Sequence, residues 1–543
     1  MVSHVFDKNI LYYGDNLDVL RKYFPNESVD LIYLDPPFNS KADYNILFKE
    51  ATGEESAAQI QAFSDFWHWD KTAEETYLEI QADPKLMDMI QFLHAYLGRN
   101  DMMAYLVMMT IRLRELHRVL KDTGSLFLHC DYHASAYLRI LLNRIFGESN
   151  FRNEIIWKRK TGRGETQHKS NQFGVCTDYI LFYAKTKKSK LNTQFVPLSE
   201  SDKSYKEYVE KFFRFTDENG RKYRIADLSS PSPRPNLMYE YKGYKPPANG
   251  WAISKEKMEQ WDREGRLYFP KSRDGRIQRK RFLDELKGKP VQNLWDDIQM
   301  ISSQSAERLG YPTQKPVALL KRIINATTDK GDVVLDPFCG CGTTIMAAQE
   351  LNRKWIGIDI THLAISLIRS RLKEIHVLAN KDYKIIGEPA DLASAVELMQ
   401  IDPTGYQFQW WALSLIDAKP AGQSATSPQG KKGADKGVDG WLTFKESDSL
   451  DLKRIVVQVK GGHVGAQTVR DLLGTVESTK SAMGILITLN EPTEQMKQVA
   501  MEAEYYESKT WGHKYPKIQI LTISELLKGS KPIIPHTLKS PAS

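Results

Sequence analysis

The chain has 543 residues, of which 41% are hydrophobic and 26% are charged, so it is long enough for two or three globular domains. No segment reaches the apolar length of a membrane span, and the first residues lack a signal-peptide pattern, so we expect a cytoplasmic protein without membrane contact. The net charge of +7 is compatible with a polyanionic partner but does not identify one, and four cysteines exclude a disulfide framework.

Two short strands are predicted first, at residues 9–13 and 29–34, and each ends in a turn. The turn Gly14-Asp15-Asn16 follows the first strand, and Asp35-Pro36-Pro37-Phe38 follows the second. Prolines fix φ and lack an N–H, so the second turn presents a carboxylate, a rigid backbone and an aromatic ring. Doubly wound α/β sheets place their ligand contacts at such strand ends.

An alternation of helices and strands continues to about residue 186. Apolar residues recur with helical spacing from 102 to 120, and Lys121-Asp122-Thr123-Gly124 is expected to close that helix with a glycine. A buried strand is predicted at 125–130, an amphipathic helix follows, and two more strands are predicted at 153–157 and 177–183. This pattern predicts a mainly parallel sheet with helices on both faces.

The segment from 187 to 294 is polar, rich in Lys, Arg, Tyr and Pro, and has no sustained αβ alternation. Its densest basic run is Arg276 to Phe282, which contains Arg279 and Arg281. Such a run is often just a solvated face, although basic side chains are also compatible with a polyanionic partner.

The αβ pattern returns with a helix at 317–326 and a strand that ends in Asp336-Pro337-Phe338-Cys339-Gly340-Cys341-Gly342-Thr343-Thr344. Glycines in such a turn allow φ > 0 and a close approach of a nucleotide-like cofactor. The two cysteines are interpreted as small loop residues, because no further cysteine pair completes a metal site. Asp359 ends the next strand about twenty residues later, as in sites that bind ribose hydroxyls. A dinucleotide site and a helix-capping Asp359 stay open as alternatives.

The chain carries the turn Asp35–Phe38 first and the glycine-rich turn Asp336–Thr344 later. These two turns, in this order, resemble the permuted β class of amino-methyltransferases, which transfer a methyl group from S-adenosylmethionine to an exocyclic NH2 of a DNA base. The resemblance covers residues 9–377 and implies a Rossmann-like α/β fold with an inserted target-recognition domain. It also implies double-stranded DNA as the partner and leaves a homodimer open. An aspartate at position 35 favours adenine N6; N4-cytosine methylation is the alternative, and an RNA methyltransferase with an accessory domain is a third hypothesis.

The resemblance also implies roles for single residues. Asp35 and the Pro36 carbonyl would accept the two N–H bonds of the target amine, next to Pro37, and the flipped base would stack on Phe38. Asp336 would bind the cofactor's ammonium, Asp359 its ribose and Asp15 its adenine end. The segment Tyr311 to Pro316 would contact its methionine carboxylate. The full set expected to bind the cofactor is Asp15, Thr313, Lys315, Asp336, Phe338, Gly340, Gly342, Thr343 and Asp359.

The last part of the chain resembles the Mrr-like branch of the PD-(D/E)XK nucleases. Asp439 lies in a glycine-flanked turn, and Gln458 and Lys460 point to one face of a predicted strand at 454–460. The resemblance implies that Asp439 and Gln458 bind Mg2+ and that Lys460 is catalytic. The first helix of this part, at 406–411, carries glutamine where relatives often have glutamate. The alternative is therefore a domain that only binds DNA or a partner.

Five segments are predicted on these grounds. They are a catalytic half at 1–186, a target-recognition insertion at 187–294, a cofactor-binding half at 295–380, a linker at 381–404 and a second α/β domain, of the restriction-endonuclease type, at 405–543.

Overall fold

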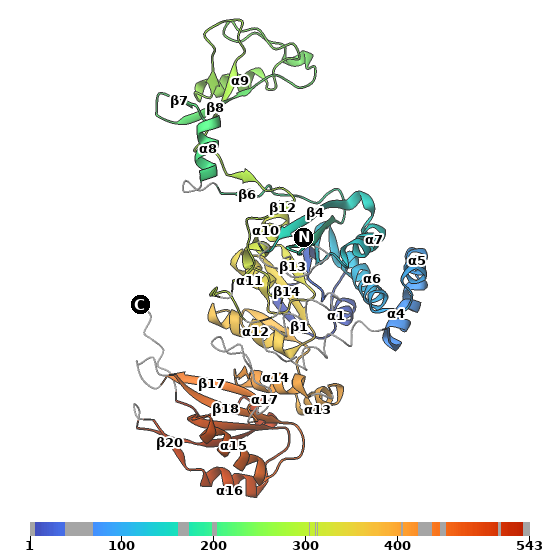
Figure 1. Ribbon diagram of the computed structural model, residues 1–543, viewed down its shortest axis with the longest axis vertical. Helices are drawn as coiled ribbons and strands as arrows, with labels where there is room; N and C mark the ends of the chain where they lie inside the picture. Colours follow the sequence, from blue (N-terminus) through green and yellow to red (C-terminus); the bar gives the residue numbers. More distant parts are fainter. Residues whose placement is uncertain are drawn as a thin grey trace. The chain divides into compact units, whose positions relative to one another are not determined.

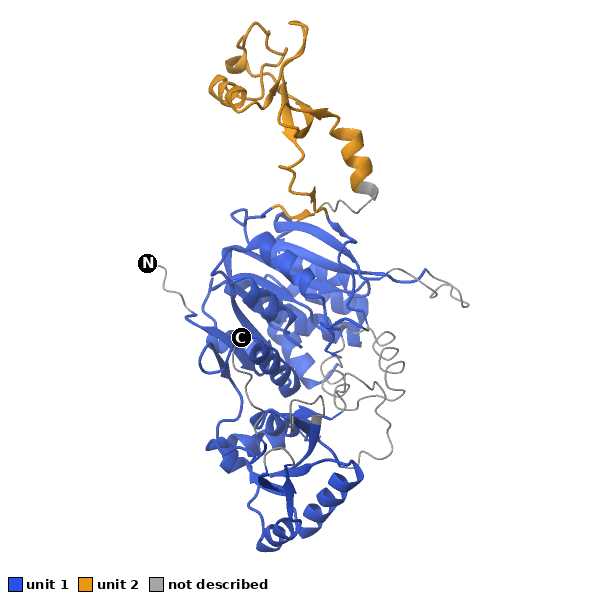
Figure 2. Ribbon diagram, turned by 90° about the vertical axis from the view of Figure 1, so that its left-hand side faces the viewer, with its two compact units in different colours: residues 1–192, 293–543 blue, residues 193–292 orange. Residues whose placement is uncertain are grey.

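The computed structural model describes residues 6–37, 69–160, 173–197, 203–302, 304–309, 311, 313–402, 405–421, 437–445, 452–508 and 512–535. These form two compact units, shown in Figure 2: residues 1–192 together with 293–543, and residues 193–292. No helix among the described residues is long and apolar enough to cross a membrane.

The larger unit is built around a nine-stranded sheet with the order β12-β4-β5-β3-β2-β13-β14-β1-β15. Neighbouring strands pair in parallel except β5, which is antiparallel to β3 and β4. This confirms the predicted mainly parallel sheet. The strands are β1 (Asn9–Tyr13), β2 (Val29–Leu34), β3 (Leu120–Cys130), β4 (Phe151–Lys158), β5 (Thr177–Ala184), β12 (Leu294–Trp295), β13 (Val333–Asp336), β14 (Lys354–Asp359) and β15 (Tyr383–Ile386).

Helices cover both faces of this sheet (Figure 1). One group packs its apolar side chains into the largest hydrophobic core: α1 (Asn16–Tyr23), α4 (Lys71–Gln81), α5 (Met87–Leu97), α6 (Asp101–Val119) and α7 (Ser135–Phe146). The other face carries α10 (Val317–Thr327), α11 (Thr343–Glu350) and α12 (His362–Glu374). A sheet covered on both faces needs strands that are mostly apolar, and β2 and β13 have this composition apart from one aspartate each, Asp30 and Asp336.

One local prediction was wrong. Residues 121–124, expected to close the helix before them, are the first part of β3, which begins directly after α6. The Lys121 ammonium lies 2.8 Å from the Asp30 carboxylate, and the Gly124 carbonyl accepts the Lys185 N–H at 3.0 Å. Both partners are distant in sequence, so the local glycine signal was overridden by tertiary pairing.

The C-terminal part of the larger unit has a five-stranded sheet of order β16-β17-β18-β19-β22. Residues 381–404, expected as a linker, contain β15, which extends the first sheet, and a helix, α13. The elements of this part are α13 (Leu392–Ile401), α14 (Tyr406–Leu415), β16 (Lys419–Pro420), β17 (Gly440–Lys445), β18 (Leu452–Lys460), α15 (Ala466–Ser478), β19 (Met483–Thr488), α16 (Glu494–Glu502), β20 (Tyr505–Glu507), β21 (Lys514–Pro516), β22 (Ile518–Thr522) and α17 (Ile523–Leu527). The Gln407 amide oxygen of α14 accepts the backbone N–H of His362, at 2.9 Å, at the start of α12.

The smaller unit has a four-stranded antiparallel sheet of order β7-β8-β10-β9 and a separate two-stranded ribbon, β6 with β11. Trp251, Met258 and Ile277 are fully buried in its own hydrophobic core. The basic run predicted near residue 280 forms β10, a central strand. The elements are β6 (Phe195–Val196), α8 (Lys203–Phe212), β7 (Phe215–Thr216), β8 (Lys222–Asp227), α9 (Lys255–Arg263), β9 (Leu267–Tyr268), β10 (Gln278–Phe282) and β11 (Lys289–Pro290).

Candidate active site

Four adjacent parallel strands, β2, β13, β14 and β1, bring the predicted site residues to one edge of the large sheet. Asp336 ends β13 and Asp359 ends β14, while Asp35 directly follows β2. Gly14 follows β1, and its N–H donates to the Asp359 carbonyl at 2.9 Å. The carboxyl ends of parallel strands meet at one edge, so the two motifs are neighbours although some three hundred residues separate them.

The glycine turn after β13 is held close to the end of β14. Gly340 has φ +48° and donates its N–H to the Asp359 carboxylate at 2.9 Å. A Cβ at Gly340 would lie 3.3 Å from the Tyr311 ring, and one at Gly342, with φ +77°, would lie 2.6 Å from Ile368. Both positions therefore require glycine, for its backbone conformation and for space.

Asp336, the last residue of β13 before this turn, is buried, with only 3% of its surface exposed. It accepts hydrogen bonds from the Thr344 hydroxyl at 2.5 Å and from the Phe338 N–H at 3.1 Å. Burial, and to a smaller extent the charges of Asp35 and Asp359, raise its pKa to about 7 despite these bonds. The pKa of Asp359 is also raised, again by burial. Three carboxyl groups thus share one desolvated edge, which is an environment that stabilises a cation.

Asp35 is paired with a lysine from the other half of the site. The Lys315 ammonium lies 2.5 Å from the Asp35 carboxylate, and both side chains are largely buried, at 11% and 15% exposure. Lys315 also donates to the backbone carbonyl of Thr313, which has φ +63°. The loop before α10 therefore reaches across to the turn that follows β2.

The turn after β1 is fixed by an arginine that sequence reasoning missed. Arg112, 4% exposed, donates to the Asp15 carboxylate at 2.6 Å and to the Asn16 amide oxygen at 2.6 Å. Asn16 in turn donates to the Pro337 carbonyl of the glycine loop at 2.8 Å. The signal in the sequence was an arginine on the apolar helix at 102–120, since a buried arginine needs an acidic partner. Arg112 thereby links the two turns.

A buried polar chain lies next to Asp35 and was also missed. The Tyr33 hydroxyl is 3.1 Å from His129 Nδ1, and His129 Nε2 is 3.2 Å from the Asp178 carboxylate. Arg159 lies 3.2 Å from the other oxygen of Asp178. Burial, and then the charge of Asp35, raises the pKa of Tyr33 well above its ordinary value, so its hydroxyl stays protonated. The tyrosine, the histidine and the aspartate therefore satisfy one another inside the sheet by hydrogen bonds.

A family model described as DNA methylase matches residues 29–370, which is more than half of the chain. The chain belongs to this DNA methylase family. It is 32% identical over 362 residues to the type III restriction-modification enzyme StyLTI Mod subunit of Salmonella typhimurium, covering 64% of the chain and 50% of that relative. It is 33% identical over 280 residues to the type II methyltransferase M.EcaI of Enterobacter cloacae, covering 51% and 59%. The chain thus spans little more than half the length of these relatives.

Solved structures of two DNA methyltransferases are similar to this chain at low sequence identity. The PvuII DNA methyltransferase, described as cytosine-N4-specific, is 15% identical with a TM-score of 0.33, covering 66% of this chain and 84% of that chain. The M1.HpyAVI–SAM complex is 15% identical with a TM-score of 0.30, covering 67% and 98%.

Most of the predicted methylase site residues come together at the sheet edge, although their roles stay predictions. Pro36 is buried and Pro37 is half-buried beside Asp35, whereas Phe38 lies outside the described residues. Asp15 is at the edge but is bonded to Arg112 and to the Leu17 N–H. Thr343 opens α11, where its hydroxyl lies 3.6 Å from the Cys341 sulfur.

In the C-terminal part of the chain, the three predicted nuclease residues are neighbours. Gln458 and Lys460 lie on β18, and the Asp439 carboxylate accepts the Val459 N–H at 2.7 Å and lies 4.0 Å from the Lys460 ammonium. Gln458 is 4% exposed, and a Cβ at Gly437 would lie 2.8 Å from its amide nitrogen. Among the described residues no group of three His, Cys, Asp or Glu side chains is placed to hold a metal. A second family model, described as NACHT-associated inactive Restriction Endonuclease 1, matches residues 426–528.

Proposed function

We propose that the chain is a DNA methyltransferase of a restriction-modification system, which transfers a methyl group from S-adenosylmethionine to adenine N6. One observation carries the proposal: the Asp35 turn and the Asp336–Gly340 turn lie on adjacent parallel strands at one sheet edge. An acceptor for a base amine and a cradle for a nucleotide-like cofactor are thus side by side.

The residues of this edge fit S-adenosylmethionine. The cofactor carries a sulfonium and an ammonium, and its sulfonium supplies the methyl group when it is bound. Two of the three acidic groups have raised pKa values because of burial, so a bound cation would relieve the cost of ionising them. The tight approach of Tyr311 to Gly340 leaves room for backbone but not for a further side chain. Asp336 and Asp359 would hold the cofactor, with Lys315 and Thr313 near its carboxylate.

Asp35 suits the target amine because its partner is an ammonium. A carboxylate in an ion pair accepts hydrogen bonds and donates none, and its second oxygen is available for an N–H. The Pro36 carbonyl offers a second acceptor from a backbone whose φ is fixed. Two acceptors on one amine favour a pyramidal nitrogen with a localised lone pair, which is the nucleophile that methyl transfer needs.

The choice of adenine over cytosine rests on the aspartate at position 35 in the resemblance to the β class. N4-cytosine methylation is the competing hypothesis. The test is to incubate the purified chain with labelled S-adenosylmethionine and either plasmid DNA or total RNA, then to digest the product and identify the modified base. We expect N6-methyladenine in DNA. N4-methylcytosine would overturn the choice of base, and label in RNA alone would overturn the substrate.

For residues 405–543 we propose a nuclease-like domain that binds DNA without cutting it. The support is a donor set with one carboxylate, Asp439, of which one oxygen already accepts a backbone N–H. The Gln458 amide is buried against Gly437. Magnesium is commonly bound through one or two carboxylates with several waters, and here one oxygen of the single carboxylate already accepts a backbone N–H, so the described residues leave few anionic oxygens for the ion. The family model that matches residues 426–528 describes an inactive restriction endonuclease, which also supports a domain that does not cut DNA. The Mg2+-dependent nuclease inferred from the sequence is the competing hypothesis.

A further inference from the structure

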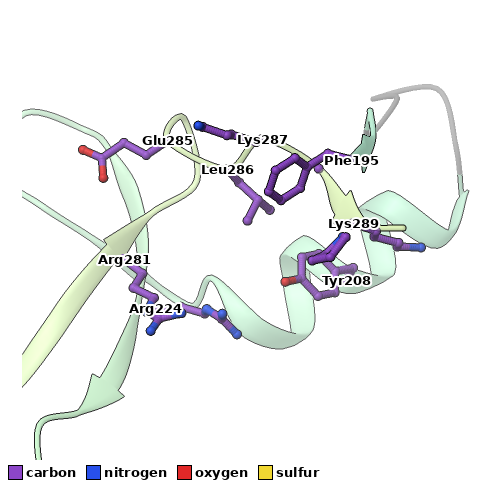
Figure 3. Close-up of a pocket in the computed structure, with 10 residues that line it drawn as sticks. Phe195, Tyr208, Arg224, Arg281, Glu285, Leu286, Lys287 and Lys289 are labelled. Carbon is purple, nitrogen blue, oxygen red and sulfur yellow. The ribbon is translucent and has the colours of Figure 1, made fainter. Parts of the chain in front are cut away.

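A cleft of about 380 Å³ lies within the smaller unit, and none of its lining residues has been discussed so far as cofactor-binding or catalytic (Figure 3). Its walls are the ribbon β6–β11, helix α8 and the pair β8–β10. It is lined by Phe195, Tyr208, Arg224, Arg281, Glu285, Leu286, Lys287, Gly288, Lys289 and Pro290. Apolar rings and cationic groups therefore face the same space.

The cationic side consists of two directly opposed arginines. Arg281 on β10 is the cross-strand partner of Arg224 on β8. Like charges directly opposite on an antiparallel pair destabilise a sheet, so an arrangement of this kind favours a bound anion. Figure 3 shows both side chains on the same side of the strands. Lys287 and Lys289 add two further positive charges at the edge of the cleft.

Within the described residues, no acidic side chain forms an ion pair with these cationic groups. The one acidic side chain in the lining, Glu285, is held by Arg266 at 2.7 Å and by Arg221 at 3.2 Å, neither of which lines the cleft. In the described parts of the chain, no ion pair is formed by Arg224, Arg281, Lys287 or Lys289. The Nε of Arg224 is moreover buried without a hydrogen-bond partner there.

The apolar side is made by Phe195 and Tyr208, with Leu286 between the walls (Figure 3). A site that binds only the phosphates of duplex DNA would not need an apolar lining. Aromatic rings beside arginines instead suit the flat face of an unpaired base. The turn that closes the cleft is fixed in place. Gly288 has φ +126°, and a Cβ there would lie 2.2 Å from the Val196 carbonyl oxygen.

We propose that this cleft binds one unpaired nucleotide of the DNA, with its phosphate on Arg224 and Arg281 and its base against Phe195 and Tyr208. This inference rests on the proposed DNA methyltransferase function and adds to it a second nucleotide site, in the insertion. Arg279, the other arginine of the basic run, is not part of it, because its guanidinium lies 4.2 Å from the centre of the Trp261 ring.

The test uses the full chain and two labelled duplexes of one sequence, of which one carries a single unpaired nucleotide. Wild-type protein should bind the bulged duplex about tenfold more tightly, since stacking of one base on aromatic side chains typically contributes this much or more. Phe195→Leu should remove that preference. The double variant Arg224→Gln/Arg281→Gln should weaken both complexes. It should also reduce the slope of log affinity against log salt by about one unit for each phosphate that is no longer bound.

Arg263→Gln is the matched control, because Arg263 is an exposed arginine of the same unit that does not line the cleft. It should leave the preference for the bulged duplex unchanged. Thermal melting of each variant separates loss of the site from loss of folding, and Tyr208→Leu replaces any variant that does not fold. Equal affinity of the wild type for both duplexes, or a preference that survives in folded Phe195→Leu or Tyr208→Leu protein, would overturn the inference. Methyl transfer is measured separately, so failure of the proposed activity and failure of the cleft give different results.

Discussion

The Lys315 ammonium and the Asp35 carboxylate are 2.5 Å apart, although 280 residues separate them in the chain. The acceptor proposed for the base amine is thereby joined to the loop proposed to meet the cofactor's carboxylate. Lys315 lies between two anionic groups in this arrangement, one from the protein and one expected from the cofactor. The pair is largely shielded from solvent, so both partners are sensitive to substitution.

Replacement of Asp35 should separate catalysis from cofactor binding. We expect Asp35→Ala to lower the rate of methyl transfer by at least about 100-fold, because the acceptor for the amine is lost. Calorimetric titration should show S-adenosylmethionine affinity close to that of the wild type. Gly340→Asp is the contrasting variant and should abolish cofactor binding, since its side chain would be forced against Tyr311. A comparable loss of affinity in Asp35→Ala would contradict the assigned role.

Lys315→Met should weaken cofactor binding by about tenfold, which corresponds to the loss of one charge-assisted hydrogen bond. Lys321→Met is the control, because Lys321 lies on the following helix and pairs at the surface with Glu350. It should bind the cofactor as the wild type does. Equal cofactor affinity in the two variants would show that Lys315 pairs with Asp35 but does not bind the cofactor.

Cofactor affinity should rise with pH between about 5.5 and 7.5. The pKa of Asp336 is raised from 3.8 to about 7, chiefly by burial, so the carboxyl of the free protein is mostly neutral at the lower end of this range. The raised pKa of Asp336 favours the folded state at low pH. This contribution to the free energy of unfolding is lost as the pH rises from 3.8 to about 7. A bound ammonium favours the carboxylate, so binding should release a proton, measurable by calorimetry in buffers of different ionisation enthalpy. Asp336→Asn should bind more weakly and without this pH dependence.

Arg112→Met should destabilise the protein and the cofactor site together. The variant leaves Asp15 and Asn16 without their buried partner, and we expect a loss of about 2 kcal/mol or more in the free energy of unfolding. Arg114→Met on the same helix removes a more exposed pair with Glu79 and should cost about 0.5 kcal/mol. Denaturant titration compares the two variants. Similar losses would mean that the Arg112 network adds little.

The C-terminal domain should not cut DNA. Full-length protein incubated with Mg2+ and DNA from a methylation-free strain should leave it intact, because the described residues offer one carboxylate that is already bonded to backbone. Lys460→Ala and the exposed control Lys528→Ala should both methylate DNA like the wild type. Cleavage that requires Mg2+ and disappears in Lys460→Ala but not in Lys528→Ala would restore the nuclease hypothesis.

The sequence by itself determined where the strands end and which turns follow them. Apolar runs before Asp35, Asp336 and Asp359 are local signals of buried strands, and parallel strands present their carboxyl ends at one edge. The glycines of the cofactor turn are local signals too, since φ > 0 at Gly340 and Gly342 restricts the choice of residue. The mainly parallel sheet and its edge of acidic residues were predictable for this reason.

Only the tertiary structure decided which side chains meet. Arg112 bonds Asp15 across 97 residues, Lys315 bonds Asp35 across 280, and His129 joins Tyr33 to Asp178. Periodicity reports that a residue is buried but not which strand lies beside it, and these pairings depend on the strand order of the sheet. The same holds for the opposed pair Arg224 and Arg281, since a basic run shows charge while the register of β8 against β10 fixes its neighbour.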